Sequence, residues 1–259
     1  MNFNGMVCVI TGGANGIGRC IAEEFLLAGA NVAIIDVDAA SGEKLVAHYG
    51  KERLLFMQGD IAEKVVLEAF SGEVLRRFGR VDYLINNACL SKKGLLSGCG
   101  FEDFDYVLRI GVAAPYYLTK LFNGSFAPGA AVVNITSTRA FMSQSDTESY
   151  TAAKGGISAL THAMAVSLAG RVRVNAISPG WIETGAYQSD AVFSPEHSES
   201  DQLQHPVHRV GVPQDIAKTV LFLCSDDAAF ITGENITVDG GMTKRMIYHN
   251  DEGWSYQPK

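Results

Sequence analysis

The sequence MVCVITGGANGIG, residues 6–18, joins a short apolar run of strand character directly to a glycine-rich turn and a helical pattern. A tight strand-to-helix turn needs glycine where φ is positive, and a bound pyrophosphate needs bare backbone close to it. The start of the helix supplies free N–H groups and the positive end of a dipole. Gly12, Gly16 and Gly18 therefore predict a phosphate-binding turn, although the same glycines also fit a purely structural turn.

Outward from this turn, apolar runs of strand length alternate with helical patterns along the chain. We expect strands at residues 6–11, 31–36, 53–58, 81–86, 130–136, 172–177 and 235–238. We expect helices at residues 16–28, 40–49, 62–78, 102–122 with an interruption at Pro115, 148–169 and 213–224. Such alternation with short connections predicts the α/β class, with a parallel sheet covered by helices on both faces.

The composition provides enough apolar residues for a sizeable core. Of 259 residues, 47% are hydrophobic and 19% are charged, and the formal net charge is −7. These values argue against disorder, and the absence of a basic stripe argues against nucleic-acid binding. No apolar stretch approaches the ~18 residues of a membrane span, and no signal peptide is visible. Five cysteines without a CxxC pair indicate reduced thiols, so we expect a cytoplasmic protein. His205 and His208 lack the further ligands that zinc needs, so we expect no metal site.

Two carboxylates stand at the expected ends of the second and third strands. Asp36 comes about twenty residues after the glycine turn, where a carboxylate can accept hydrogen bonds from both adenosine ribose hydroxyls. It would repel a 2′-phosphate, and Val37-Asp38 supplies no positive charge, so NAD is favoured over NADP. The alternative is a surface or helix-capping aspartate. Asp60, followed by Ile61, could bind the adenine amine, cap the next helix, or do both.

Tyr150 and Lys154 lie four residues apart in an expected helix and therefore on one face of it. A nearby ammonium favours the phenolate form of a tyrosine, which makes the pair a proton donor and acceptor for a carbonyl/alcohol couple. Ser137 follows the fifth expected strand, at the carboxyl edge where open α/β sheets bind ligands, and could hydrogen-bond a substrate carbonyl.

With these residues in place, the chain resembles the classical short-chain dehydrogenase/reductase family over residues 6–241. The matching pieces occur in the family's order: TGGANGIG (11–18), Asp36, Asp60, NNA (86–88), Ser137, YTAAK (150–154), PGWIET (179–184) and VDGG (238–241).

The resemblance implies a Rossmann-type, doubly wound parallel sheet of seven strands and hydride transfer to or from C4 of nicotinamide. It implies that Tyr150 is the general acid/base, that Lys154 holds the nicotinamide ribose and favours the phenolate, and that Ser137 orients the substrate oxygen. Together with the residue-based expectations, it gives an NAD-binding set: Gly12, Asn15, Gly16, Ile17, Gly18, Asp36, Asp60, Ile61, Asn87, Ala88, Tyr150, Lys154, Pro179, Gly180, Ile182 and Thr184. Because family members are commonly tetramers built on long helices, we expect a homo-oligomer, either a tetramer or a dimer.

Two positions depart from the family pattern. Gly111 stands where the family usually has an asparagine that holds a water linking the catalytic lysine to solvent. Either a water and a backbone group substitute for that side chain, or turnover is reduced, and a local kink at Gly111 is expected. Cys89 replaces the glycine that usually ends the NNAG motif, and we interpret it as a buried, inert cysteine.

We therefore expect an NAD(H)-dependent oxidoreductase that interconverts a secondary alcohol and a ketone. An NAD(H)-binding sensor or scaffold with little turnover is the alternative, which Gly111 keeps open. An epimerase or dehydratase is less favoured, because such relatives usually carry a longer C-terminal substrate domain. The substrate itself is not readable from the sequence.

The domain is expected to span residues 1–242, since no composition break or linker divides the chain. Its long polar segment 185–211 is expected to form a mobile lid over the substrate, and Trp181 either lines the substrate pocket or fills the core. The tail 243–259 carries three aromatic residues, and we expect it to dock on a neighbouring subunit near the active site.

Overall fold

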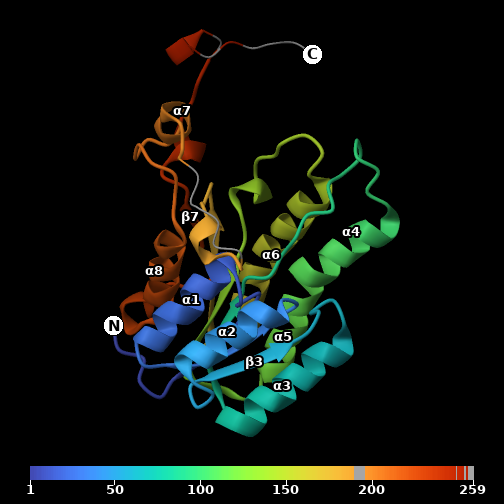
Figure 1. Cartoon of the computed structure of the whole chain (residues 1–259), viewed down its shortest axis with the longest axis vertical. Coiled ribbons are helices and arrows are strands. Elements are labelled where there is room, and N and C mark those ends of the chain that lie inside the picture. Colours follow the sequence, from blue (N-terminus) through green and yellow to red (C-terminus); the bar gives the residue numbers. More distant parts are fainter. Residues whose placement is uncertain (190–195, 249, 254, 256–259) are drawn as a thin grey trace.

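Within residues 1–189, 196–248, 250–253 and 255, the part of the chain that the computed structural model describes, seven strands form one parallel sheet (Figure 1). The order across the sheet is β3-β2-β1-β4-β5-β6-β7. The strands are β1 (Val7–Thr11), β2 (Asn31–Asp36), β3 (Leu54–Gln58), β4 (Val81–Asn86), β5 (Phe126–Ile135), β6 (Arg173–Pro179) and β7 (Asn235–Val238). The doubly wound, Rossmann-type sheet predicted from the sequence is confirmed, and its order reverses between β1 and β4.

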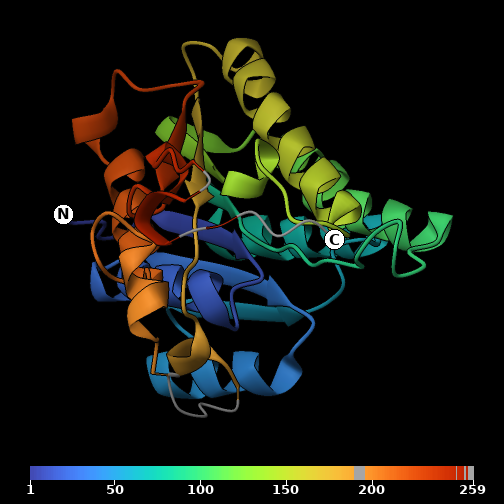
Figure 2. The same cartoon turned by 90° about the horizontal axis from the view of Figure 1, so that it is seen from above.

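The helices cover both faces of the sheet (Figure 2). Successive strand residues point to opposite faces, so Ile10 and Ile34 pack with α1, α2 and α8, whereas Val9 and Ile35 pack with α3, α5 and α6. The α-helices are α1 (Gly16–Leu27), α2 (Ala39–Tyr49), α3 (Lys64–Phe78), α4 (Phe101–Leu108), α5 (Ala114–Phe122), α6 (Glu148–Ser167), α7 (Glu199–Leu203) and α8 (Pro213–Cys224). Short 3₁₀ turns are η2 (Thr138–Ala140), η3 (Gly185–Tyr187), η4 (Asp226–Ala228), η5 (Met242–Lys244) and η6 (Asp251–Gly253).

The long helix expected at residues 102–122 is α4 and α5 joined by a π-helical turn, η1 (Arg109–Ala113). The interruption thus precedes Pro115, which sits in the first turn of α5, and the kink expected at Gly111 takes the form of this turn. A proline cannot donate a hydrogen bond to the preceding turn and crowds its carbonyl groups, and a wider π-turn relieves that conflict.

The polar segment 185–211 contains η3 and α7 in its described part. Phe193 of this segment lies outside the described residues, as do Trp254 and Tyr256, two of the three aromatic residues of the tail. In Figure 1 the red C-terminal segment lies beyond α7, away from the sheet, and Tyr248 in it is exposed. The docking of the tail and the domain boundary at residue 242 therefore stay predictions. No helix among the described residues is long and apolar enough to cross a membrane.

A buried chain of polar side chains connects the sheet centre to α6. The Asn86 amide nitrogen donates to Asn134 Oδ1 at 2.8 Å, and the Asn134 amide nitrogen donates to Thr161 Oγ1 at 2.9 Å. Thr161 in turn donates to the Ile157 carbonyl at 2.9 Å. All three polar side chains are buried, so each hydrogen bond replaces one to water that folding removed. These hydrogen bonds therefore fix β4, β5 and α6 relative to one another.

We expect Asn134→Ala to lower the free energy of unfolding by about 2–4 kcal/mol, because it leaves the buried Asn86 amide without its partner and opens a small cavity. Asn123→Ala removes an exposed hydrogen bond to Arg171 and should change stability by less than about 0.5 kcal/mol. Urea unfolding followed by circular dichroism measures both. If both variants lost the same small amount of unfolding free energy, the buried hydrogen bonds of Asn134 would not stabilise the fold.

Candidate active site

The glycine turn between β1 and α1 has the geometry of an anion cradle. Gly12 and Gly16 have φ values of +65° and +57°, which strain any side chain. A Cβ on Gly18 would lie 2.0 Å from the Gly12 carbonyl oxygen, so this position also requires glycine. Within the described residues, no side chain caps the start of α1, although Asn15 occupies the capping position. The first N–H groups of α1 are therefore available to a bound anion.

Asn87 fastens the loop after β4 to this turn. Its amide nitrogen donates to the carbonyl oxygens of Thr11 and Gly12, at 3.0 Å each. The backbone amides of Asn87 and Ala88 donate to Thr11 Oγ1 at 3.0 and 3.1 Å. The contact lies at the reversal of strand order, where sheets of this type bind ligands.

Two carboxylates stand at the end of β2. Asp36 accepts hydrogen bonds from the backbone amides of Ala14, at 3.0 Å, and Asp38, at 3.1 Å, which fix its carboxylate beside the glycine turn. Asp38 accepts hydrogen bonds from Ser41 Oγ, at 2.7 Å, and Asn15 Nδ2, at 2.9 Å. These hydrogen bonds, with that of Ser41 the strongest, lower the pKa of Asp38 to about 2. This edge therefore carries negative charge at neutral pH.

Asp60 accepts a hydrogen bond from the Tyr106 hydroxyl at 2.7 Å and from the Ala62 amide at 2.9 Å. The hydrogen bond to Asp60, followed by burial, raises the pKa of Tyr106 to about 12. Because α3 begins at Lys64 with Glu63 as its N-cap, the capping role considered for Asp60 is wrong.

A hollow of about 420 Å³, here called the glycine-turn cavity, runs along this edge. Among the described residues, those that line it include Asp36 and Asp60 but no lysine or arginine. Other predicted residues that line it are Gly12, Asn15, Gly16, Ile17, Ile61, Asn87, Ala88 and Thr184. Gly18 does not line the cavity, because it packs beneath the turn against Gly12.

Ser137, Tyr150 and Lys154 come together beyond the end of β5. Lys154 is buried, and its Nζ donates to the Ile135 carbonyl at 2.7 Å and lies 5.4 Å from the centroid of the Tyr150 ring. The guanidinium carbon of Arg139 lies 5.8 Å from the same centroid. Two cations thus lie within cation–π distance of the Tyr150 ring.

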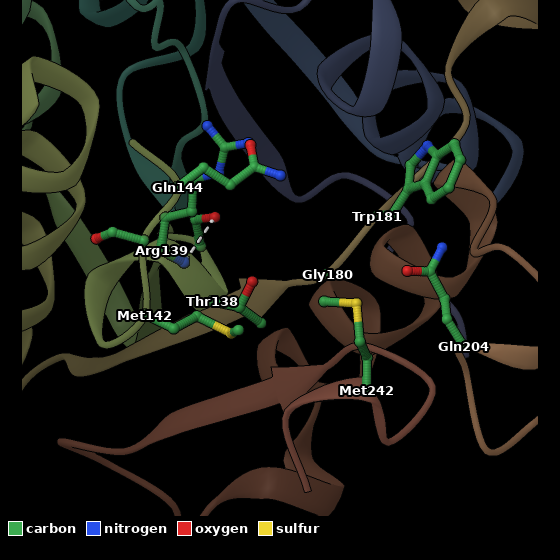
Figure 3. A pocket seen from close by; sticks show the side chains of 10 residues that line it. Thr138, Arg139, Met142, Gln144, Gly180, Trp181, Gln204 and Met242 are labelled. Atoms are coloured by element: carbon green, nitrogen blue, oxygen red, sulfur yellow. Dashed lines mark hydrogen bonds between the residues drawn. The ribbon is translucent and has the colours of Figure 1, made fainter. Parts of the chain in front are cut away.

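These three residues line a central cavity of about 190 Å³. It shares Ile17, Asn87 and Cys89 with the glycine-turn cavity. It also shares Ser137 and Gly180 with an outer cavity of about 460 Å³ (Figure 3). The three hollows therefore follow one another from the glycine turn, past Tyr150, to the protein surface.

The segment after β6 forms the opposite wall. Pro179 ends β6, and the Gly180 amide donates to the Val238 carbonyl at 3.0 Å, which continues the pairing with β7. Pro179, Gly180 and Ile182 line the central cavity, and Thr184 lines the glycine-turn cavity. All four predicted residues of this segment thus line a cavity, and their contacts with a cofactor stay a prediction.

Trp181 lines the outer cavity and is 39% exposed, so the alternative of core filling is wrong. Tyr187 does not line this cavity. Its ring centroid lies 5.7 Å from the guanidinium carbon of Arg19, and its hydroxyl accepts a hydrogen bond from Gln214 at 2.5 Å. Tyr187 therefore anchors its segment on α1 and α8 in this structure, and the lid over the substrate stays a prediction.

Several residues around the cavities were not found from the sequence. Arg139 and Gln144 line the outer cavity, and Tyr106 and Gln188 line the glycine-turn cavity. Of these, Arg139 carried a readable signal, because it follows Ser137 by two residues. The structure holds, within its described residues, no cluster of three or more His, Cys, Asp or Glu that could bind a metal ion.

Gly111 is buried where η1 crosses α6. A Cβ at this position would lie 2.7 Å from the Cβ of Ala153 and 3.6 Å from Cys89 Sγ. Any side chain at residue 111 therefore conflicts with the turn of α6 that carries Lys154. The interpretation of Cys89 as a buried residue is wrong, because it is partly exposed and lines two cavities.

Comparison with known proteins shows similarity over almost the whole chain. A family model described as Enoyl-(Acyl carrier protein) reductase matches residues 12–243. An uncharacterized oxidoreductase of Thermotoga maritima is 39% identical over 254 residues, which are 95% of this chain and 99% of the relative. The 3-oxoacyl-(acyl-carrier-protein) reductase FabG of the same organism is 31% identical over 93% of this chain and 99% of its own.

Solved structures also resemble this chain over most or all of its length. An apo SCOR enzyme from Clostridium thermocellum has 44% identity and a TM-score of 0.89, with 100% of both chains covered. A short-chain dehydrogenase/reductase, glucose/ribitol dehydrogenase, from Brucella melitensis has 31% identity and a TM-score of 0.84 over 93% of this chain and 99% of that one. A blue fluorescent protein from a metagenomic library, in complex with NADPH, has 29% identity and a TM-score of 0.84 over the same shares.

We expect Gly111→Ala to lower the free energy of unfolding by about 1–3 kcal/mol, because the new methyl group overlaps Ala153. The double variant G111A/A153G removes the overlap and should recover part of the loss, because glycine at residue 153 itself costs about 1 kcal/mol in the helix. Gly72→Ala is the control, since a Cβ at this exposed position in α3 meets nothing within 4 Å and should stabilise by up to about 1 kcal/mol. Urea unfolding measures all three, and a single variant as stable as the parent would contradict the steric argument.

Proposed function

The chain belongs to the classical short-chain dehydrogenase/reductase family, and we propose that it is an NAD(H)-dependent oxidoreductase that interconverts a secondary alcohol and a ketone. The observation that carries this proposal is the row of three joined cavities with Tyr150 beside the middle one. A dinucleotide fits the first cavity, its reactive ring the second and a substrate the third.

The glycine turn fits the pyrophosphate of such a cofactor. The start of α1 has free N–H groups that can donate to phosphate oxygens. Asn15 Oδ1 is buried without a hydrogen-bond partner among the described residues, so it can accept a hydrogen bond from a hydroxyl group of the cofactor. Asp36 would hold the adenosine ribose, and Asp60 with Ile61 would adjoin the adenine. The proposed nicotinamide contacts are Asn87, Ala88, Tyr150, Lys154, Pro179, Gly180, Ile182 and Thr184. When bound, the nicotinamide accepts or supplies the hydride.

The protein's own residues handle the proton and orient the substrate. In the direction of oxidation, Tyr150 as phenolate takes the proton of the substrate hydroxyl while the carbon that bears it loses hydride and becomes a carbonyl. Ser137 Oγ accepts a hydrogen bond from the Arg139 amide at 3.2 Å, which leaves its own proton for the substrate oxygen. Lys154 stabilises the phenolate and would bind the nicotinamide ribose. Reduction reverses these steps, with Tyr150 as the proton donor.

The preference for NAD(H) rests on the charges at the end of β2. Asp36 and Asp38 would repel a 2′-phosphate, and the described lining of the glycine-turn cavity offers no basic residue to bind it. The blue fluorescent protein is in complex with NADPH, so the family resemblance alone does not favour either cofactor.

The proposed homo-oligomer, a tetramer or dimer, has a suitable surface. A mainly apolar hollow of about 450 Å³ lies between α4, η1, α5 and α6, and its rim residue Tyr116 is half exposed. A second copy of these helices would cover it, as in the long-helix interfaces that the family resemblance implies.

We expect Tyr150→Phe to lower kcat by roughly 10²–10⁴-fold, because it removes the proton donor and acceptor. NADH binding, measured by fluorescence titration, should change less than about threefold, since the ring and Lys154 remain. Tyr117→Phe, a matched loss of one hydroxyl on α5 that donates a hydrogen bond to Glu68, should leave both unchanged. If Tyr150→Phe abolished binding as well as turnover, the assigned role would be wrong. Saturable NADH binding without turnover on any alcohol or ketone would instead indicate the sensor or scaffold.

We expect the double variant D36A/V37R to shift the ratio of kcat/KM for NAD⁺ over NADP⁺ by roughly 10²-fold or more toward NADP⁺. The change removes charge-assisted hydrogen bonds to the ribose and places a guanidinium at Val37, which is 62% exposed. Asp38→Asn preserves the N-cap of α2 while removing one charge, so it should shift the ratio far less. A parent enzyme that already prefers NADP⁺ would refute the NAD(H) proposal.

A further inference from the structure

The outer cavity contains a cation for which the described residues provide no counter-ion. Arg139 is partly buried and lines the cavity, yet it forms no ion pair with a described carboxylate, and the described lining contains no acidic residue. The chain has a net charge of −7, and the only other basic side chain near the Tyr150 ring among the described residues is the buried Lys154, so Arg139 is not part of a basic surface. A guanidinium in such a hollow is most stable when an anion completes it.

The guanidinium is held in place from two sides. Its Nη2 donates to the side-chain oxygen of Gln144, and its carbon lies 5.8 Å from the Tyr150 ring centroid. In Figure 3 the ends of Arg139 and Gln144 lie together on one side of the cavity, across from Trp181 and Gln204. Because its orientation is fixed before a ligand arrives, less entropy is lost when its remaining N–H groups bind an anion.

We propose that Arg139, oriented by Gln144, binds the carboxylate of the substrate, so that the substrates are short hydroxy acids and the corresponding oxo acids. The planar fork of N–H groups matches a carboxylate, and the amide nitrogen of Gln144 can add a further donor. This inference rests on the proposed function, because it places the substrate's reacting carbon at Ser137 and Tyr150.

The position of Arg139 beside Ser137 and Tyr150 restricts the chain length of the hydroxy acid. Arg139 follows Ser137 by two residues, lies beside the Tyr150 ring and lines the same cavity as Ser137. A carboxylate bound here therefore lies only a few bonds from the hydroxyl that Tyr150 deprotonates. The apolar parts of Met142, Trp181 and Met242 provide space for a short hydrocarbon chain on the other side.

The test compares each hydroxy acid with its own methyl ester, which keeps the alcohol and removes the charge. The panel contains the 2-, 3- and 4-hydroxy acids of five carbons, all of them secondary alcohols, assayed with NAD⁺ on the full-length enzyme. We expect the acid of at least one pair to have the higher kcat/KM, and Arg139→Met to raise KM for that acid by roughly 10–100-fold. The same change should leave kcat and KM for the ester nearly unaltered. Arg139→Lys should recover part of the loss, and Arg171→Met, at an exposed site bonded to Asn123, should have no effect.

A second role for Arg139 gives a different result. If it acts only by stabilising the Tyr150 phenolate, Arg139→Met will lower kcat equally for acid and ester and move both pH profiles to higher pH. That outcome overturns the proposal, as does a parent enzyme that oxidises alcohols with no preference for the acids.

A binding measurement separates this proposal from the proposed function. Calorimetry of the hydroxy acids with the Tyr150→Phe variant saturated with NAD⁺ should detect binding, which Y150F/R139M should weaken at least tenfold. If the parent protein showed no turnover but bound the acids in a way that depends on Arg139, the result would support this inference and contradict the proposed oxidoreductase function. Binding that is absent or insensitive to Arg139 would overturn the inference.

Discussion

The hydrogen bonds from the Asn87 side chain to the backbone of Thr11 and Gly12 join the two strand ends on which the site depends. They connect the glycine turn after β1 with the loop after β4 at the point where the strand order reverses, so the two loops form one surface of the site. Only bare backbone allows this approach, because a side chain on Gly12 or Gly18 would occupy the space of the contact. The position of the proposed cofactor therefore follows from main-chain packing, and side-chain chemistry is added at its two ends.

A second connection, between β5 and α6, fixes the position of Tyr150. Lys154 is buried and bonds to the Ile135 carbonyl, directly after the strand residue Asn134, which is itself bonded to α6. α6 is thus attached to β5 at two levels, and Tyr150, one turn before Lys154, has little freedom to move away from the central cavity. The same attachment explains why a buried ammonium is tolerated here: a backbone carbonyl and the face of a phenol ring lie next to it.

The sequence was sufficient for the sheet and for most of the site, because both depend on local patterns. Apolar runs locate strands, and a glycine turn or a Tyr-Lys pair four residues apart can be recognised without the fold. It was insufficient where distant segments determine the outcome. The π-turn at Gly111 depends on packing against α6, and the exposure of Cys89 depends on cavities formed by several loops. The place of Arg139, two residues after Ser137, was a signal that it lies near the site, but nothing local shows which cavity its side chain enters.

The close approach of Gly111 and Ala153 also restricts how this sequence can evolve. A side chain at residue 111 needs space that the Ala153 methyl group now fills, and a glycine at residue 153 by itself weakens α6. Either order of change passes through a less stable intermediate, so each of the two positions restricts the residues that the other can accept. The two positions should consequently drift as a pair among descendants of this sequence.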